Sequence, residues 1–193
     1  MAFTLQLGHV APNFDLPGVD GRNYALNTFS AARFLIVVFS CNHCPYVIGS
    51  EDRLIQLYKD YLSRGVALVA INSNDTGVHP EDSFEHMVAR AKSKKFLFPY
   101  VRDASQDVVR AYGALRTPHF YVFDAARKLC YTGRMDDNPR EAAKATTHEL
   151  RDALDALLAE KKPAVELTNP IGCNVKWRGQ EAHWMPAEAC DLV

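Results

Sequence analysis

The chain has 193 residues, of which 48% are hydrophobic and 23% charged, a composition typical of a folded globular protein. Its 22 Lys and Arg residues nearly balance 23 Asp and Glu residues, and the formal net charge of -1 excludes a general attraction to nucleic acid or anionic membranes. The sequence contains no apolar stretch of the roughly 18 to 20 residues that cross a bilayer. Residues 1–5 have neither the basic start nor the apolar segment of a secretory signal, so we expect a cytoplasmic protein with reduced thiols.

The first half of the chain predicts parallel strands joined by a helix. Short apolar pieces, interrupted by Pro and Gly, predict a β extension over residues 1–33. Residues 34–39 and 66–71 are continuous apolar runs, typical of strands covered on both faces. Between these runs, apolar residues recur at helical spacing from position 47 to position 62. A strand, a helix and a strand of this length predict a right-handed βαβ unit.

The second half predicts shorter elements and an irregular end. We interpret residues 72–100 as an insert that carries a helix over 80–95. Beyond residue 160 the periodicity is lost, which predicts one domain over 1–160 and an extension over 161–193 packed on it. The remaining expected elements are a short strand at 98–101, a helix at 104–112, a hairpin of strands at 119–124 and 129–132, and a helix at 150–158.

The most informative motif is Ser-Cys-Asn-His-Cys-Pro at positions 40–45. Two cysteines three positions apart at a helix start can close a disulfide, and the positive helix end favours a thiolate at the first, Cys41. A cysteine with a pKa of about 8.5 is about 3% ionised at pH 7, whereas a pKa of about 6 gives roughly 90%. That shift corresponds to about 3.4 kcal/mol, more than the roughly 0.3 to 1 kcal/mol typical of a helix terminus. His43 is the candidate for the remaining stabilisation.

A Cys-x-x-Cys pair has other uses in proteins. It can form half of a zinc site, but a second such pair is absent, since Cys130, Cys173 and Cys190 are scattered. Two packed cysteines of no chemical consequence are a further alternative. The strand-then-helix context favours a redox-active dithiol of Cys41 and Cys44.

Three motifs carry a resemblance to a known family. They are Val-Ala-Pro-Asn-Phe-Asp-Leu at 10–16, Cys-Asn-His-Cys at 41–44, and Tyr-Gly-Ala-Leu-Arg-Thr-Pro at 112–118. With them, the chain resembles the thioredoxin superfamily, in the branch of peroxiredoxin-like redoxins and cytochrome-maturation thioredoxins. Longer runs at 70–75 and 172–177 are similar to bacterial thioredoxin-family proteins. The resemblance implies a thioredoxin-like three-layer α/β fold, with a mixed central sheet, helices on both faces, an N-terminal β extension and a C-terminal tail.

The resemblance also implies roles for individual residues. Cys41 is expected to attack a disulfide and Cys44 to resolve the mixed disulfide. Thr117 and Pro118 match the loop whose proline is cis and holds the substrate backbone, and we place Asn42 with them as substrate-binding. His43 matches a histidine of oxidising family members, with an exposed loop residue of little effect as the alternative. The implied partners are disulfide-containing proteins or small thiols and a dithiol electron donor, without a dissociable cofactor.

The sequence departs from thioredoxin in one chemically important place. Thioredoxin has a buried aspartate on the strand before its dithiol, whereas residues 34–39 are all apolar. A proton acceptor for Cys44 must then come from elsewhere. Asp75, Glu81 and Glu85 are candidates by analogy with the cytochrome-maturation branch, although we favour a solvated loop or helix-cap role for each.

The rival enzyme hypothesis is a peroxiredoxin-like thiol peroxidase with antioxidant activity. Peroxiredoxins need a Pro-x-x-x-Thr-x-x-Cys motif. Counting back from Cys41 puts Val38 and Phe34 at the threonine and proline positions, and counting from Cys44 puts Cys41 and Val37 there. A dedicated peroxide pocket is therefore not predicted, while slow peroxide reduction through an accessible thiolate stays open.

The rival non-enzyme hypothesis is a metal-binding redox carrier or chaperone. Cys173, His183 and Cys190, or Cys44 with His119, offer donor atoms for zinc or copper. For such scattered residues a structural role is the alternative, and we predict no metal ligands.

Two remaining cysteines lie outside the dithiol motif. Cys130 falls in an expected strand, where it is predicted to be a small buried hydrophobe. Cys173 lies in the Gly-Cys-Asn-Val-Lys-Trp run at 172–177, which leaves a third redox cysteine open. The oligomeric state is not indicated by the sequence.

Overall fold

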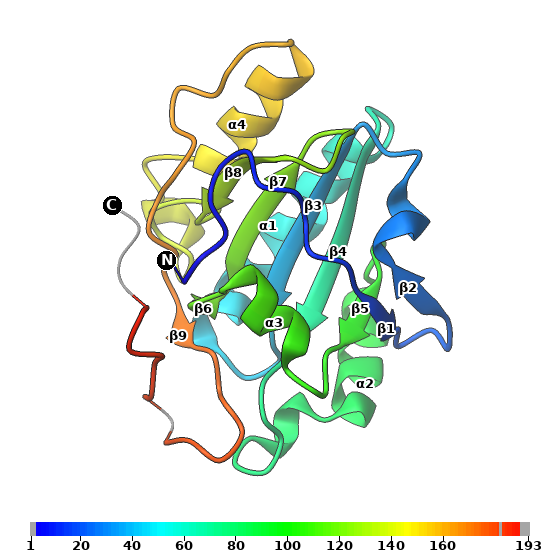
Figure 1. The fold of residues 1–193 in the computed structure, drawn as a ribbon, viewed down its shortest axis with the longest axis vertical. Helices are drawn as coiled ribbons and strands as arrows, with labels where there is room; N and C mark the ends of the chain where they lie inside the picture. The colour runs from blue at the N-terminus through cyan, green and yellow to red at the C-terminus, as the bar shows by residue number, and fades with distance from the viewer. Residues whose placement is uncertain (1–2, 182, 190–193) are drawn as a thin grey trace.

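The computed structural model describes residues 3–181 and 183–189 and contains a five-stranded mixed sheet with helices on both faces (Figure 1). The strand order is β5-β4-β3-β7-β8, in which β3, β4 and β5 are parallel and β7 and β8 are antiparallel to their neighbours. The mixed α/β architecture expected from the sequence is therefore confirmed. The strands are β3 (Phe34–Ser40), β4 (Val66–Asn72), β5 (Tyr100–Arg102), β7 (His119–Phe123) and β8 (Leu129–Gly133).

The apolar strand β3 is buried along its whole length because it contributes side chains to two cores. Phe34, Ile36 and Val38 pack into one core and Leu35, Val37 and Phe39 into the other, since successive strand residues point to opposite faces. The first core contains α1 (Pro45–Leu62), α2 (Phe84–Lys94) and α4 (Glu149–Leu158); the second contains α3 (Asp107–Tyr112) and the N-terminal segment.

The N-terminal extension contains the expected pair of short strands. β1 (Asp15–Pro17) and β2 (Asn23–Ala25) form an antiparallel hairpin, and Gly18 bridges to Val101 of β5. The hairpin therefore lies beside the β5 edge of the main sheet (Figure 1).

The expected helix over 80–95 is divided in two. Residues Pro80–Asp82 form a 3₁₀ helix, and α2 begins only at Phe84. The break falls at Ser83, which is extended and accepts the backbone N–H of His86 as the N-cap of α2. This break turns the Pro80–Asp82 segment toward the start of α1, where Asp82 becomes fully buried.

The sequence analysis did not predict two of the strands. β6 (Arg116–Thr117) and β9 (Cys173–Asn174) pair antiparallel, so the C-terminal segment contacts the chain just before Pro118. The division at residue 160 stays a prediction. Among the described residues, no helix is both long enough and apolar enough to span a membrane.

Candidate active site

The two motif cysteines lie where β3 gives way to α1. Cys41 follows the last residue of β3, and Cys44 is the N-cap of α1 with Pro45 as the first helical residue. Proline fits there because the first N–H groups of a helix have no partner within it. Both cysteines are reduced, with exposed fractions of 2% and 0%. The dithiol is thus preformed at the helix start but shielded from solvent.

The Thr117–Pro118 segment faces the dithiol, and its peptide bond is cis, which confirms the sequence expectation. The Thr117 carbonyl oxygen lies 3.1 Å from Cys44 Sγ, which donates to it. The Thr117 hydroxyl lies 3.5 Å from Cys41 Sγ. One residue therefore contacts both sulfurs, through its backbone and its side chain.

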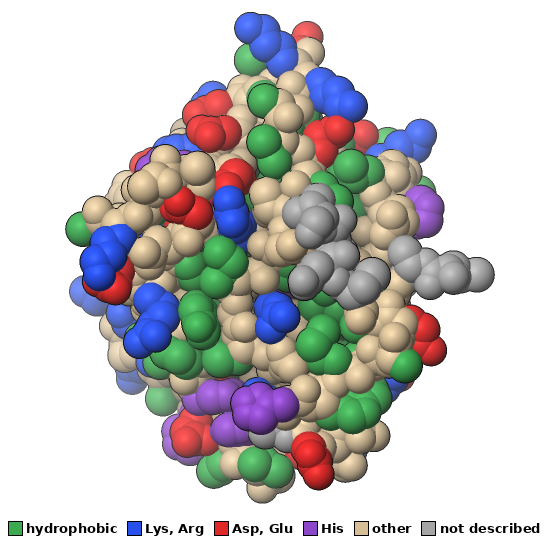
Figure 2. All heavy atoms as spheres, turned by 90° about the vertical axis from the view of Figure 1, so that its left-hand side faces the viewer, with side chains coloured by type: hydrophobic (Ala, Val, Ile, Leu, Met, Phe, Trp, Pro, Cys, Tyr) green, Lys and Arg blue, Asp and Glu red, His purple; other side chains and the backbone are tan. Residues whose placement is uncertain are grey.

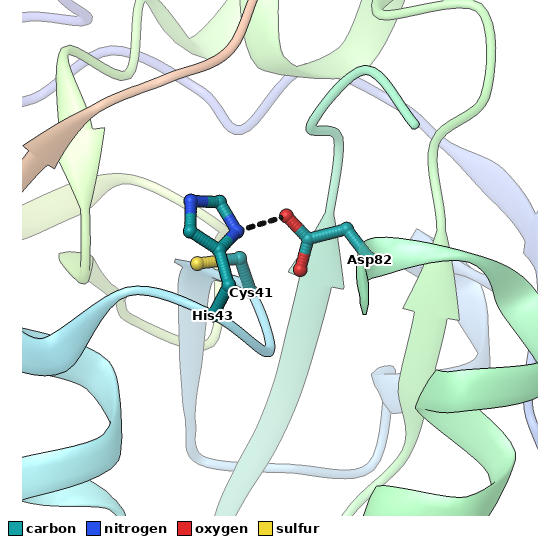
Figure 3. Close-up of side chains that lie close together, drawn as sticks. All are labelled: Cys41, His43 and Asp82. Carbon is teal, nitrogen blue, oxygen red and sulfur yellow. Dashed lines mark hydrogen bonds and ion pairs between the residues drawn. The ribbon is translucent and has the colours of Figure 1, made fainter. Parts of the chain in front are cut away.

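His43 forms an ion pair with a residue that the sequence analysis did not single out, Asp82 (Figure 3). The His43 Nδ1 atom lies 2.7 Å from Asp82 Oδ2, and this hydrogen bond raises the pKa of His43. The ring of His79 stacks on His43 at a centroid distance of 4.0 Å and an angle of 1°. Burial and repulsion from His43 lower the pKa of His79, which favours one charged and one neutral ring.

Asp82 is a fully buried carboxylate with several hydrogen-bond donors. It accepts the Asn42 backbone N–H at 2.6 Å, the Asn74 side chain at 2.9 Å and the His43 ring. Burial opposes ionisation, but the hydrogen bonds, that of His43 foremost, lower the pKa of Asp82. The sequence offered no signal for it, because acidic residues are common at any helix start.

The candidate proton acceptors chosen from the sequence do not occupy this position. Glu81 and Glu85 are exposed. Asp75 is half-buried, and its backbone N–H donates to the Lys176 carbonyl in the C-terminal segment. The buried acid beside the dithiol is Asp82, and the exposure of Glu81 and Glu85 agrees with the solvated role that we favour for them.

The pKa shifts of the two thiols have opposite directions. Burial raises the pKa of Cys41, and its hydrogen bond to Cys44 and the Asp82 charge act in the same direction. A hydrogen bond from Cys41 lowers the pKa of Cys44, against the effect of burial. The two thiols therefore titrate as a coupled pair, in which a charge on either sulfur is stabilised by the proton on the other. The lowered pKa expected at Cys41 stays a prediction.

Asn42 lies between the cysteines, yet its side chain is turned inward. Its Nδ2 atom donates to the Glu81 carbonyl at 2.8 Å, and its Oδ1 atom accepts the Tyr100 hydroxyl at 3.0 Å. With its backbone N–H on Asp82, Asn42 holds the Pro80–Asp82 segment against the dithiol. In this structure Asn42 positions the acid, and its substrate-binding role stays a prediction.

Of the candidate metal ligands, His119 is enclosed by protein partners. Its Nδ1 atom accepts the Leu115 N–H at 3.3 Å, and its Nε2 atom lies 3.1 Å from the Thr132 hydroxyl. Burial lowers the pKa of His119 to about 3, so the ring is neutral. His183 is exposed, and Cys190 lies outside the described residues.

Donor atoms of Cys41, His43 and Asp82 lie within 4.8 Å of one another, a spacing that could hold a metal ion. Both Asp82 oxygens already accept hydrogen bonds within the protein. Asp82 is therefore already paired with His43, beside the Cys41 thiol.

The His43 ring is more exposed to solvent than the sulfur of Cys41. The His43 side chain is 16% exposed, whereas Cys41 is 2% exposed. Figure 2 shows histidine side chains gathered with acidic ones on one face of the molecule.

The sequence model of the Redoxin family matches residues 6–153. The chain belongs to the Redoxin family. Two solved structures are similar to this redoxin over most of its length. A hypothetical protein, SMc02350, from Sinorhizobium meliloti 1021 is 39% identical with a TM-score of 0.87, covering 93% of this chain and 98% of that one. An uncharacterized conserved protein from Geobacillus kaustophilus is also 39% identical, with a TM-score of 0.86, covering 93% and 96% of the two chains.

A curated relative carries a functional name. The thiol-disulfide oxidoreductase ResA of Bacillus thuringiensis is 21% identical over 125 residues, covering 65% of this redoxin and 68% of ResA. The thioredoxin-like fold and the thioredoxin-superfamily assignment are thereby confirmed.

Proposed function

We propose that this redoxin is a thiol-disulfide oxidoreductase whose reactive groups are Cys41 and Cys44. The observation that carries the proposal is the contact of both sulfurs with Thr117, next to the cis Pro118. Family membership and the similarity to ResA support the same class of reaction. The substrates are disulfides of proteins or small molecules, and a dithiol protein returns the electrons. Because the dithiol itself carries the electron pair, no dissociable cofactor is needed.

Catalysis begins with a proton shift between the two sulfurs. Cys41 passes its proton to Cys44, so that the single charge of the coupled pair lies on Cys41. The Thr117 carbonyl then accepts the Cys44 S–H, and the Thr117 hydroxyl lies beside the Cys41 thiolate. Protonated His43 neutralises Asp82, which otherwise opposes charge on Cys41. His43 thereby favours the reactive form, and a stabilised thiolate makes the disulfide a stronger oxidant.

The exchange then follows in two balanced steps. The Cys41 thiolate attacks one sulfur of the substrate disulfide, forms a mixed disulfide and releases the first substrate thiol. Cys44 loses its proton and attacks Cys41, which releases the second thiol and leaves a Cys41–Cys44 disulfide. The substrate gains two electrons and two protons; the dithiol supplies both electrons and the Cys44 proton, and solvent supplies the second proton.

Trapping of partners tests the proposal. In Cys44→Ser the mixed disulfide on Cys41 cannot be resolved, so disulfide-linked proteins should accumulate on incubation with a cell lysate. Cys41→Ser should trap none by this route, and Cys130→Ser is the matched control that should behave as wild type. Failure of the Cys173→Ser chain, which lacks the neighbouring third thiol, to form a Cys41–Cys44 disulfide in a glutathione buffer would falsify the proposal.

The same preparations test the two rival hypotheses. Rapid sulfenic acid formation at Cys41 with stoichiometric peroxide supports a peroxidase. Stoichiometric zinc or copper on the purified chain supports a metal carrier, with Cys41, His43 and Asp82 as the ligands to replace. A cytoplasmic location stays a prediction of the sequence, and cell fractionation tests it.

A further inference from the structure

The C-terminal segment pairs with the edge of β6, beside the dithiol. β9 pairs antiparallel with β6, with Cys173 opposite Thr117 and Asn174 opposite Arg116 (Figure 1). Extended peptides often bind by adding a strand to such an edge, where main-chain hydrogen bonds hold them. The chain has therefore placed its own strand where Thr117 could pair with a substrate backbone.

The residues that follow β9 make buried contacts that hold the strand in place. Val175 and Trp177, which follow it, are 2% and 4% exposed, and the Arg110 guanidinium lies 4.9 Å from the centre of the Trp177 ring. The Lys176 backbone N–H donates to Asn74 Oδ1 at 2.9 Å. The apolar and polar contacts together fix the position of the preceding residues.

The approach of the strand requires a glycine. A Cβ atom at Gly172 would lie 2.1 Å from the Thr117 carbonyl oxygen, far inside contact distance. Arg116 Nη1 donates to Asn174 Oδ1 at 2.9 Å on the other side of Cys173. Cys173 is therefore held between a close backbone contact and a side-chain hydrogen bond.

The side chain of Cys173 meets the dithiol. It packs against the cluster formed by Cys41, Cys44 and Val47. Burial and the neighbouring Cys44 raise the pKa of Cys173 to about 12, so this third thiol is protonated in the reduced chain. Cys44 thus contacts two thiols, Cys41 and Cys173. Cys130 differs, since its Sγ atom contacts the Lys128 carbonyl at 3.4 Å.

We propose that Cys173 is a third redox-active cysteine, which exchanges with the Cys41–Cys44 disulfide while β9 acts as a built-in substrate strand. The inference rests on the proposed function, which supplies that disulfide. Cys173 Sγ gives up its proton and attacks Cys44 Sγ; the Cys41–Cys44 bond breaks, and Cys41 leaves as a thiolate that takes up a proton. One disulfide and one thiol are present before and after, so the step needs no outside oxidant.

The exchange has a direct chemical consequence. Moving the disulfide to Cys44–Cys173 frees the Cys41 thiol while the chain remains oxidised. An external partner must displace β9 from β6 to pair with Thr117, so the segment also controls access to the dithiol.

Labelling of Cys41 tests the exchange in a chain that keeps its dithiol. The protein is oxidised with one equivalent of diamide, alkylated with N-ethylmaleimide and analysed by mass spectrometry without reduction. Oxidised wild type should contain a Cys44–Cys173 disulfide and label Cys41 at least about ten-fold more than Cys173→Ser. Cys130→Ser should label as wild type does. Equal labelling of Cys41 in wild type and Cys173→Ser overturns the inference.

A second variant keeps all the thiols and moves the strand. Gly172→Ala should displace β9 and reduce the Cys44–Cys173 disulfide by about ten-fold, while the Cys41–Cys44 disulfide still forms. Cys41→Ser, treated in the same way, should form the Cys44–Cys173 disulfide directly. Free Cys44 and Cys173 in that variant overturn this inference alone. A Cys173→Ser chain that forms no Cys41–Cys44 disulfide overturns the proposed function and this inference together.

Discussion

Replacement of Asp82 by asparagine should destabilise the redoxin strongly and in a pH-dependent way. Asp82 is fully buried and accepts from Asn42, His43 and Asn74. A hydrogen bond to a charged group contributes about 1.5 to 3 kcal/mol, and removal of one partner from a buried ion pair typically costs about 3 to 5 kcal/mol. Because the three contacts form one network, their energies do not add. We expect Asp82→Asn to lower the free energy of unfolding by about 3 to 5 kcal/mol near pH 6.

The pH dependence follows from the two pKa shifts. The raised pKa of His43 gives stability that is fully present below its ordinary value of 6.5 and is lost as the pH rises through the folded value. The lowered pKa of Asp82 gives stability that is present above its ordinary value of 3.8 and is lost as the pH falls through the folded value. The difference between wild type and Asp82→Asn should therefore be largest between about pH 4 and 6.5 and shrink in alkali.

Urea unfolding followed by far-ultraviolet circular dichroism, under reducing conditions and across this pH range, measures the effect. Glu81→Gln is the matched control, since it makes the same change at the exposed neighbouring acid and should leave the midpoint unchanged. A loss below about 1 kcal/mol, or the same loss at acidic and alkaline pH, would refute the assignment of Asp82 and His43 as a buried ion pair.

Three further predictions concern His119, Cys44 and Trp177. In the unfolded chain, His119 is protonated below its ordinary pKa of 6.5, whereas burial holds its pKa in the folded chain at about 3. The free energy of unfolding therefore decreases as the pH falls, by about 2 kcal/mol at about pH 5. His119→Asn should remove this decrease in urea titrations. The same dependence of unfolding free energy on pH in wild type and His119→Asn would contradict the prediction. Thiolate absorbance of the reduced chain should titrate with a midpoint of about 5 and lose that step in Cys44→Ser but not in Cys130→Ser; its persistence in Cys44→Ser would show another origin. Trp177→Ala should cost about 3 to 5 kcal/mol and speed alkylation of Cys44 as the C-terminal segment loosens, and an unchanged alkylation rate would show that this anchor does not control access.

The central strands and the location of the dithiol were accessible from the sequence because they depend on local pattern. Residues 34–39 and 66–71 carry uninterrupted apolar runs, which only a strand covered on both faces accommodates. The helical spacing after Pro45 placed the cysteines at a helix start without any knowledge of tertiary contacts. The cis Thr117–Pro118 bond came from the family resemblance, because local sequence does not determine the isomer.

Tertiary structure alone decided which acid serves the site. Asp82 lies one residue from Glu81 and three from Glu85, and all three suit the start of a helix. Only the break at Ser83 and the hydrogen bonds to Asn42 bury Asp82. Local pattern does not report which side of a turn faces the core.

The linear sequence also did not predict the pairing of β6 with β9 or the pKa shifts of the two thiols. β6 and β9 have two residues each, too few to show a strand period, and they are far apart in the chain. The pKa order of Cys41 and Cys44 depends on burial, on Asp82 and on Cys173, which reach the motif from separate parts of the fold. The sequence by itself determined the positions of the two motif cysteines and the framework that carries them. Their charges and their third sulfur neighbour were decided only by folding, because electrostatic and packing energies depend on distances that the linear order does not contain.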